Sequence, residues 1–80
     1  MNEEEIIGTL TTILQDLLAN PSIVLTPATV RNDVPGWDSF AYVNFIVAVE
    51  IEFGLRFRVA DVESFQTVGD IVSEIVALTA

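Results

Sequence analysis

Residues 36–55 read GWDSFAYVNFIVAVEIEFGL, and the helical character of the chain is clearest in this stretch. It predicts a helix from Ser39 to about Phe53, with Asp38 as its N-cap and Gly54 as its stop. One face of this helix carries an apolar stripe suited to a core: Tyr42, Phe45, Ile46, Val49 and Phe53. A second stripe lies on another face: Phe40, Asn44, Val47 and Ile51. An 80-residue bundle is too thin to bury both, so we expect the second stripe to be exposed as a docking surface. The alternative is a central helix packed on most of its sides.

Ser39 stands in the first turn of the predicted helix. Amide groups in a first turn lack partners within the helix and, with the helix dipole, attract anions such as phosphate. Taken alone, this pattern favours the simpler interpretation that Asp38 or Ser39 only caps the helix. Such a cap contributes about 1 kcal/mol to stability. A serine that carries a phosphodiester is the functional alternative.

The segment before this helix divides into another helix and a long loop. Residues 3–18 predict a helix that opens on three glutamates and carries its apolar stripe at steps of three and four: Ile6, Leu10, Ile13, Leu14 and Leu17. Asn20-Pro21 ends it. Residues 21–37 lose this period and contain three prolines and Gly36, yet keep apolar side chains: Ile23, Val24, Leu25 and Val30. We therefore expect a long loop attached to the core, of the kind that often has a function.

After Gly54 the chain predicts an extended connector at residues 55–59 and a short helical turn at about 60–64. Thr67 and Asp70 form a capping-box pattern that starts a last helix. Its predicted buried stripe is Val68, Ile71, Val72, Ile75 and Leu78. The chain thus reads as one all-α domain, residues 1–80. It is a small four-helix bundle of three main helices and one short helix, with a long loop between helices one and two.

Composition excludes several classes of function. The chain contains no cysteine, histidine or lysine, so we expect no metal site, and no base is available to activate Ser39 for catalysis. A net charge of −9 argues against nucleic acid and anionic membranes, and favours partners with basic patches as much as simple solubility. The start is acidic, unlike a signal peptide, and no apolar run approaches the ~20 residues of a spanning helix. We expect a cytoplasmic monomer that is not an enzyme.

Four segments together resemble the acyl carrier proteins, and the resemblance covers nearly the whole chain. They are Leu25-Thr26-Pro27, Gly36-Trp37-Asp38-Ser39-Phe40, Glu50-Ile51-Glu52-Phe53-Gly54-Leu55 and Phe65-Gln66-Thr67-Val68-Gly69-Asp70-Ile71. Asp-Ser alone carries no information. Its distance from the Glu-x-Glu-Phe-Gly ending and from the Thr-Val-x-Asp helix start is what makes the resemblance specific.

The resemblance implies a function for Ser39. In this family the serine that opens the second helix receives 4′-phosphopantetheine from coenzyme A, so Ser39 is the implied attachment site, and Asp38 would help a phosphopantetheinyl transferase to recognise it. Acyl groups would be held as thioesters on the arm. Acyl-loading and acyl-processing enzymes would dock on helix two at Phe40, Asn44, Val47 and Ile51. The implied pathways are fatty acid, lipid or polyketide synthesis.

The chain departs from the family pattern in three ways. Phe40 replaces the usual leucine, Ala41 and Asn44 stand where acidic residues are common, and Arg56 and Arg58 enter a stretch that is usually acidic. Acidic residues remain in the later part: Glu50, Glu52, Asp61 and Glu63. We therefore expect a specialised carrier. Aromatic rings near the acyl-enclosing positions of the family, here Val43, Ile46, Val62 and Ile71, predict poor enclosure of long saturated chains.

Two alternatives remain open. A peptidyl or D-alanyl carrier would share the fold and the arm, although the motif Gly-Trp-Asp-Ser favours acyl cargo over aminoacyl cargo. A helical adaptor would bind partners through helix two and would never be modified. The two classes differ in whether a transferase adds mass to the protein.

Overall fold

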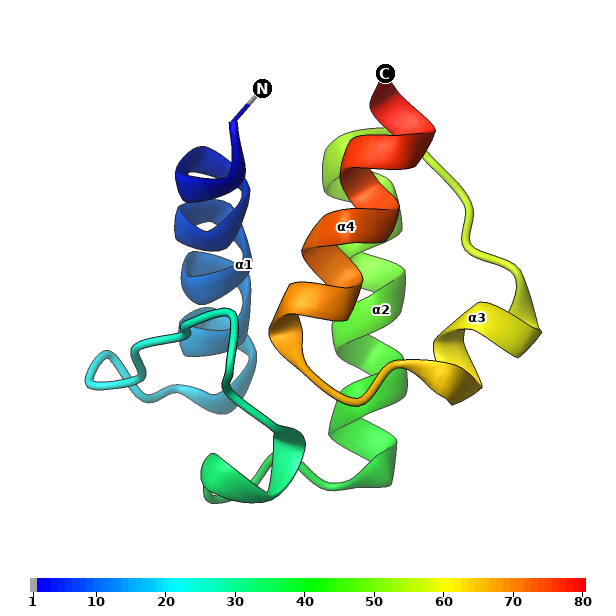
Figure 1. Cartoon of the computed structure of the whole chain (residues 1–80). Coiled ribbons are helices and arrows are strands. Elements are labelled where there is room, and N and C mark those ends of the chain that lie inside the picture. The colour runs from blue at the N-terminus through cyan, green and yellow to red at the C-terminus, as the bar shows by residue number, and fades with distance from the viewer. Residues whose placement is uncertain (1) are drawn as a thin grey trace.

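The computed structural model describes residues 2–80, and its regular elements within these residues are helical (Figure 1). The elements are α1 (Glu3–Leu18), the 3₁₀ helix η1 (Arg31–Asp33), α2 (Ser39–Phe53), α3 (Val59–Ser64) and α4 (Val68–Thr79). Helix α1 contacts both α2 and α4, α4 lies in front of the upper part of α2 in this view, and α3 lies to the right of the lower part of α2 (Figure 1). The predicted all-α bundle of three main helices and one short helix is confirmed.

The core is formed by one face of each main helix. Side chains with almost no exposure come from α1, α2 and α4: Ile6, Leu10, Leu14, Phe45, Val49, Val68, Ile71, Val72 and Ile75. Two members of the predicted stripes are wrong, because Leu17 is 38% exposed and Leu78 is 45% exposed. Each lies in the last turn of its helix. Periodicity identifies the face of a helix but does not show how far along that face the cover extends.

Local signals account for where the helices begin and end. Asn2 caps α1 by accepting a hydrogen bond from the Glu5 amide at 2.8 Å, and Gly54 closes α2 in a left-handed conformation with a φ of 65°. The end of α1 is less usual, because Ala19 adopts a φ of 51°. The amide of Asn20 there donates to the Gln15 carbonyl.

The long loop between α1 and α2 is attached to the core, as predicted. Ile23, Leu25, Val34 and Trp37 are buried, while Val24 points to solvent. The Gln15 side-chain amide of α1 donates to the carbonyls of residues 21 and 23 at 3.2 and 2.9 Å. The loop also contains η1, which the sequence pattern did not predict.

The same loop closes the first turn of α4. The amides of Val68 and Gly69 donate to the carbonyls of Thr29 and Pro27, both at 2.9 Å. Val30 and Thr67 form an isolated antiparallel bridge beside them. Amides in the first turn have no partner within their own helix, so the loop satisfies donors that α4 cannot.

Replacing Gly69 with alanine is expected to lower the free energy of unfolding by about 1 kcal/mol or more, the contribution of a lost hydrogen bond. A Cβ at this position would lie 2.9 Å from the Pro27 carbonyl oxygen, so the loop would have to move away from α4. Gly8→Ala is the matched control, because a Cβ there meets nothing within 4 Å. The free energy of unfolding of Gly8→Ala should rise by roughly 0.5–1 kcal/mol. Urea denaturation of both variants measures the two changes. Equal gains would show that the loop does not constrain Gly69.

The predicted capping box of α4 is confirmed. The Thr67 hydroxyl accepts from the Asp70 amide at 3.2 Å, and the Asp70 carboxylate accepts from the amides of Gln66 and Thr67 at 2.9 and 3.2 Å. These hydrogen bonds lower the pKa of Asp70 below its ordinary value, and the bond from the Gln66 amide has the largest effect.

A lowered pKa in the folded state means that the unfolded chain binds a proton more readily. The contribution of Asp70 to stability is therefore complete above the unfolded pKa, and it is lost as the pH falls through the folded pKa. We expect Asp70→Asn to lower the melting temperature at neutral pH and to have less effect in acid. Thermal melts across the acidic range test this, with Glu52→Gln on α2 as a control of equal charge change. A loss of melting temperature in Asp70→Asn that is the same at every pH would contradict the stabilising role of the ionised Asp70 carboxylate.

In the described residues 2–80, no helix combines the length and the apolar character that crossing a membrane requires.

Candidate functional site

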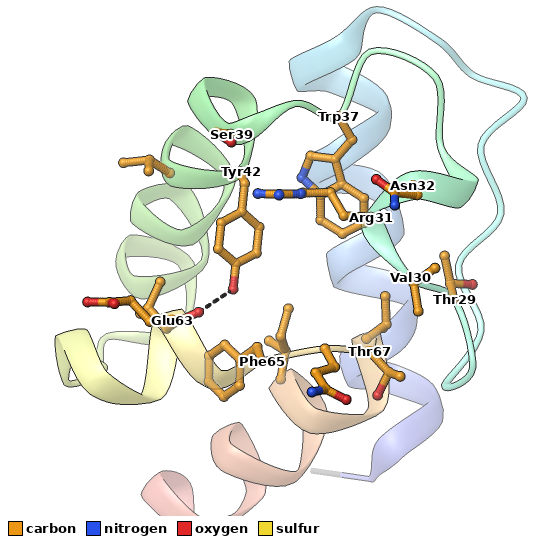
Figure 2. Close-up of a pocket in the computed structure, with 15 residues that line it drawn as sticks. Thr29, Val30, Arg31, Asn32, Trp37, Ser39, Tyr42, Glu63, Phe65 and Thr67 are labelled. Atoms are coloured by element: carbon orange, nitrogen blue, oxygen red, sulfur yellow. Dashed lines mark hydrogen bonds between the residues drawn. The ribbon is translucent and has the colours of Figure 1, made fainter.

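Ser39 is the first residue of α2, and its side chain is exposed (Figure 2). Gly36, with a φ of 87°, turns the loop just before it. The cap of α2 is Asp38, whose carboxylate accepts from the Ala41 amide at 2.8 Å. Among the hydrogen bonds of residues 2–80, none engages the Ser39 hydroxyl. The capping role therefore belongs to Asp38, and Ser39 is left available.

A half-open cleft of about 580 Å³ lies beside Ser39 (Figure 2). The long loop, α2, α3 and the start of α4 all contribute to its walls. Three of the four positions named for acyl enclosure line it, namely Val43, Val62 and Ile71, whereas Ile46 is buried in the core. Most of the polar lining was not predicted from the sequence, because it comes from segments far apart in the chain: Thr29, Arg31, Asn32, Glu63, Gln66 and Thr67.

Tyr42 links two sides of the cleft. Its hydroxyl donates to the Val62 carbonyl at 2.8 Å, which ties α2 to α3 (Figure 2). The Arg31 guanidinium lies 5.1 Å from the centre of the Tyr42 ring, a cation–π distance. Burial raises the pKa of the Tyr42 hydroxyl above its ordinary value, and the Arg31 charge offsets part of this rise.

Trp37 packs between the core and the cleft. Its ring lies edge-on to Phe45 with centroids 5.2 Å apart, and 6.3 Å from the Tyr42 ring. Its indole nitrogen, Nε1, is buried and has no hydrogen-bond partner in the part of the chain that the structure describes, residues 2–80. No pattern around Trp37 in the sequence could have shown that this donor is unpaired, because its surroundings come from other elements.

The second stripe of α2 is exposed, as predicted. Phe40 and Ile51 are each 77% exposed, and Asn44 and Val47 are exposed as well. Val43 joins this surface, and its spacing from Phe40 and Val47 could have indicated this. The exposed face of α2 is therefore a continuous, mainly apolar strip that starts next to Ser39.

Ala41 and Asn44, which stand where the family often has acidic residues, lie on different faces of α2. Ala41 is only 9% exposed and lies on the core side of the helix. Of the pair Ala41 and Asn44, only Asn44 reaches the exposed strip.

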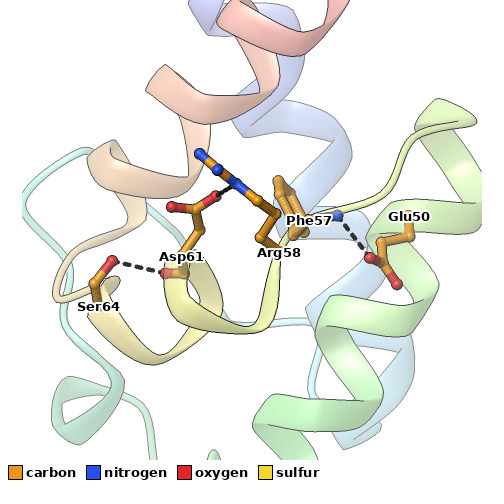
Figure 3. Close-up of polar contacts among 5 residues, drawn as sticks. All are labelled: Glu50, Phe57, Arg58, Asp61 and Ser64. Carbon is orange, nitrogen blue, oxygen red and sulfur yellow. Dashed lines mark hydrogen bonds and ion pairs between the residues drawn. The ribbon is translucent and has the colours of Figure 1, made fainter.

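Charged side chains on and near the segment after α2 make local contacts (Figure 3). The Glu50 carboxylate accepts from the Phe57 amide at 2.8 Å, which fixes the connector against α2. Arg58 pairs with Asp61 at 3.3 Å on the surface, and such exposed pairs contribute little to stability. Two acidic residues of this region therefore have local partners: Glu50 is paired with the Phe57 amide, and Asp61 with Arg58. Residues 2–80 bring together no cluster of three metal-ligating side chains.

No family model matches the chain. It is 35% identical over 74 residues to the acyl carrier protein of Thermotoga maritima, a match that covers 92% of this chain and 91% of the relative. It is 32% identical to the acyl carrier protein of Acidothermus cellulolyticus, with 99% and 94% covered. The solution structure of a holo acyl carrier protein from Geobacter metallireducens superposes with a TM-score of 0.84 at 30% identity, covering 91% of this chain and 84% of that one.

Helical fold and sequence together define a small carrier protein, a class that transports a bound group and is not an enzyme. Within that class, the chain belongs to the acyl carrier protein family. Proteins of this family work with the transferases that modify them and with the enzymes that process their acyl groups.

Proposed function

We propose that this protein holds acyl intermediates as thioesters on a 4′-phosphopantetheine arm attached to Ser39 and delivers them to partner enzymes. The observation that carries the proposal is the position of Ser39, exposed at the first turn of α2 and not engaged in the cap. The thiol at the end of the arm supplies the nucleophile that a chain without cysteine lacks.

The residues around Ser39 fit a phosphodiester. The Asp38 carboxylate accepts a hydrogen bond from the Ala41 amide, and the Asp38 carbonyl accepts one from the Tyr42 amide. The amides of Ser39 and Phe40 remain without a partner among the hydrogen bonds of residues 2–80. Free first-turn amides and the positive end of the helix dipole stabilise a phosphate group.

Attachment of the arm would join the Ser39 oxygen to phosphorus as the pyrophosphate bond of coenzyme A breaks, with adenosine 3′,5′-bisphosphate as the leaving group and loss of the Ser39 hydroxyl proton. This chain has no histidine or lysine to accept the proton, and the adjacent Asp38 carboxylate is hydrogen-bonded to the Ala41 amide, so we propose that the transferase supplies the base. Asp38 keeps Ser39 on the exposed first turn by capping the helix, and it is available at the surface for recognition by that enzyme.

Partner enzymes are proposed to dock on the exposed strip of α2: Phe40, Val43, Asn44, Val47 and Ile51. This strip is mainly apolar and carries no charge, although the protein as a whole has a net charge of −9. Docking would therefore depend on apolar contact more than on paired charges along the strip. This supports a specialised carrier for fatty acid, lipid or polyketide synthesis, which we propose acts as a monomer.

The test is intact mass spectrometry of the folded protein after incubation with coenzyme A and a promiscuous phosphopantetheinyl transferase. We expect the mass to increase by one phosphopantetheine, and peptide mapping to place it on Ser39. An unchanged mass would leave an unmodified helical adaptor as the remaining interpretation, and modification of another side chain would remove Ser39 as the attachment site.

A further inference from the structure

The indole nitrogen of Trp37 is a buried donor without a hydrogen-bond partner among residues 2–80. Trp37 is only 5% exposed, and within residues 2–80 its Nε1 is the buried side-chain nitrogen or oxygen without a hydrogen bond. An unsatisfied buried donor costs about 1–3 kcal/mol, so such atoms call for an explanation. Trp37 belongs to the lining of the cleft beside Ser39, and Figure 2 shows its nitrogen on the side that faces Arg31 and Tyr42.

A positive charge lines the same cleft. The Arg31 side chain reaches from the long loop toward Tyr42 in Figure 2, with its guanidinium 5.1 Å from the centre of the Tyr42 ring. The ion pair within residues 2–80 is that of Arg58 with Asp61, so Arg31 has no carboxylate within salt-bridge distance. Glu63 also lines the cleft, but its carboxylate points away from Arg31.

The two groups impose a chemical preference on the contents of the cleft. A saturated chain would leave the Trp37 donor unpaired and would remove water from the Arg31 guanidinium without replacing it, which is unfavourable. A chain with an oxygen acceptor would satisfy the donor and lie beside the charge. Sites built around polar groups discriminate strongly against analogues that lack the matching group.

We propose that the cleft beside Ser39 receives an acyl cargo that carries an oxygen acceptor beyond the thioester, a keto or carboxylate oxygen, which accepts a hydrogen bond from Trp37 Nε1 and is attracted by Arg31. The inference rests on the proposed function, because the arm on Ser39 delivers the cargo. The arm has amide carbonyls of its own, which offer the same acceptor chemistry, so the experiment has to separate arm from cargo.

Trp37 is the single tryptophan of the chain, so the protein gives one indole signal in a ¹H–¹⁵N correlation spectrum. Four forms are compared: the unmodified protein, the protein with the arm alone, and two forms loaded through hydrolysis-resistant amide analogues. One of these carries a short saturated chain and the other its β-keto counterpart of equal carbon count. We expect a downfield shift of the indole proton and slower solvent exchange in the β-keto form, with a much smaller change in the saturated form.

Each other outcome has a defined meaning. A shift of equal size with the arm alone assigns the acceptor to the arm and overturns the inference, as does an equal shift with the saturated chain. Intact mass is recorded for every sample, so a failure to load Ser39 is recognised separately as a failure of the proposed function.

Variants test the role of the charge. Arg31→Leu should reduce the indole shift caused by the β-keto cargo, whereas Arg56→Leu, an equal charge change outside the cleft, should leave it unchanged. In a second measurement, the β-keto form of the unaltered protein should melt at a higher temperature than the saturated form, and Trp37→Phe should abolish this difference. If Trp37→Phe does not fold, the indole signal of the Arg31→Leu protein still decides. An indole shift that is insensitive to Arg31→Leu would remove Arg31 from the site.

Discussion

Ser39→Ala is expected to abolish the gain of mass that a phosphopantetheinyl transferase produces on this protein. The loss should be complete, because the hydroxyl of Ser39 is the atom that would form the phosphodiester, and alanine has no oxygen to replace it. The fold should survive, since Asp38 supplies the cap of α2 and the Ser39 side chain is exposed. We expect its free energy of unfolding to stay within about 0.5 kcal/mol of the original.

Ser73→Ala is the matched control for this experiment. Ser73 is also an exposed serine on a helix, but it lies in the middle of α4, where the backbone amides are paired within the helix. The Ser73→Ala protein should be modified as fully as the original. Modification that persists in Ser39→Ala, or disappears in Ser73→Ala, would place the attachment site elsewhere.

Phe45→Ala is expected to cost about 3–5 kcal/mol of stability, the usual range for removing a buried aromatic ring. Phe45 is 0% exposed and packs edge-on against Trp37. Domains of this size have a total stability of only about 4–12 kcal/mol, so the variant should be partly or largely unfolded at moderate urea concentration. Urea denaturation followed by circular dichroism measures the loss.

Phe40→Ala makes the same chemical change on the opposite face of the same helix. Phe40 is 77% exposed, so its replacement should change the free energy of unfolding by no more than about 0.5 kcal/mol. It should instead weaken docking of a partner, about tenfold or more if Phe40 is a central anchor of the interface. A large loss of stability in Phe40→Ala would mean that this ring is covered. Unchanged binding to every partner tested would remove it from the docking surface.

The helices of this protein could be predicted because their signals are local. The spacing of Ile6, Leu10 and Leu14 identifies the inner face of α1 from residues within a few turns of one another. The caps Asp38 and Thr67 and the stop at Gly54 act on amides or carbonyls only a few positions away. The expectation of one buried and one exposed stripe on α2 followed from the thickness of an 80-residue bundle.

Several features depended on elements that are distant in the sequence. Leu17 and Leu78 follow the apolar period, yet they are 38% and 45% exposed, because burial depends on what packs over each position. The contact of the loop with the first turn of α4 joins residues about forty positions apart, so no short pattern could indicate it. The aromatic cluster predicts poor enclosure of long saturated chains, and that prediction remains to be tested.

Ser39 as the candidate attachment site could be read from the chain, because a serine after a capping aspartate at a helix start is defined by its immediate neighbours. The character of the cleft beside it could not. Trp37, Arg31 and Tyr42 meet there only after the loop folds back over α2 and α4. Whether a buried donor finds a partner depends on every group packed around it, and those groups come together only when the whole bundle forms.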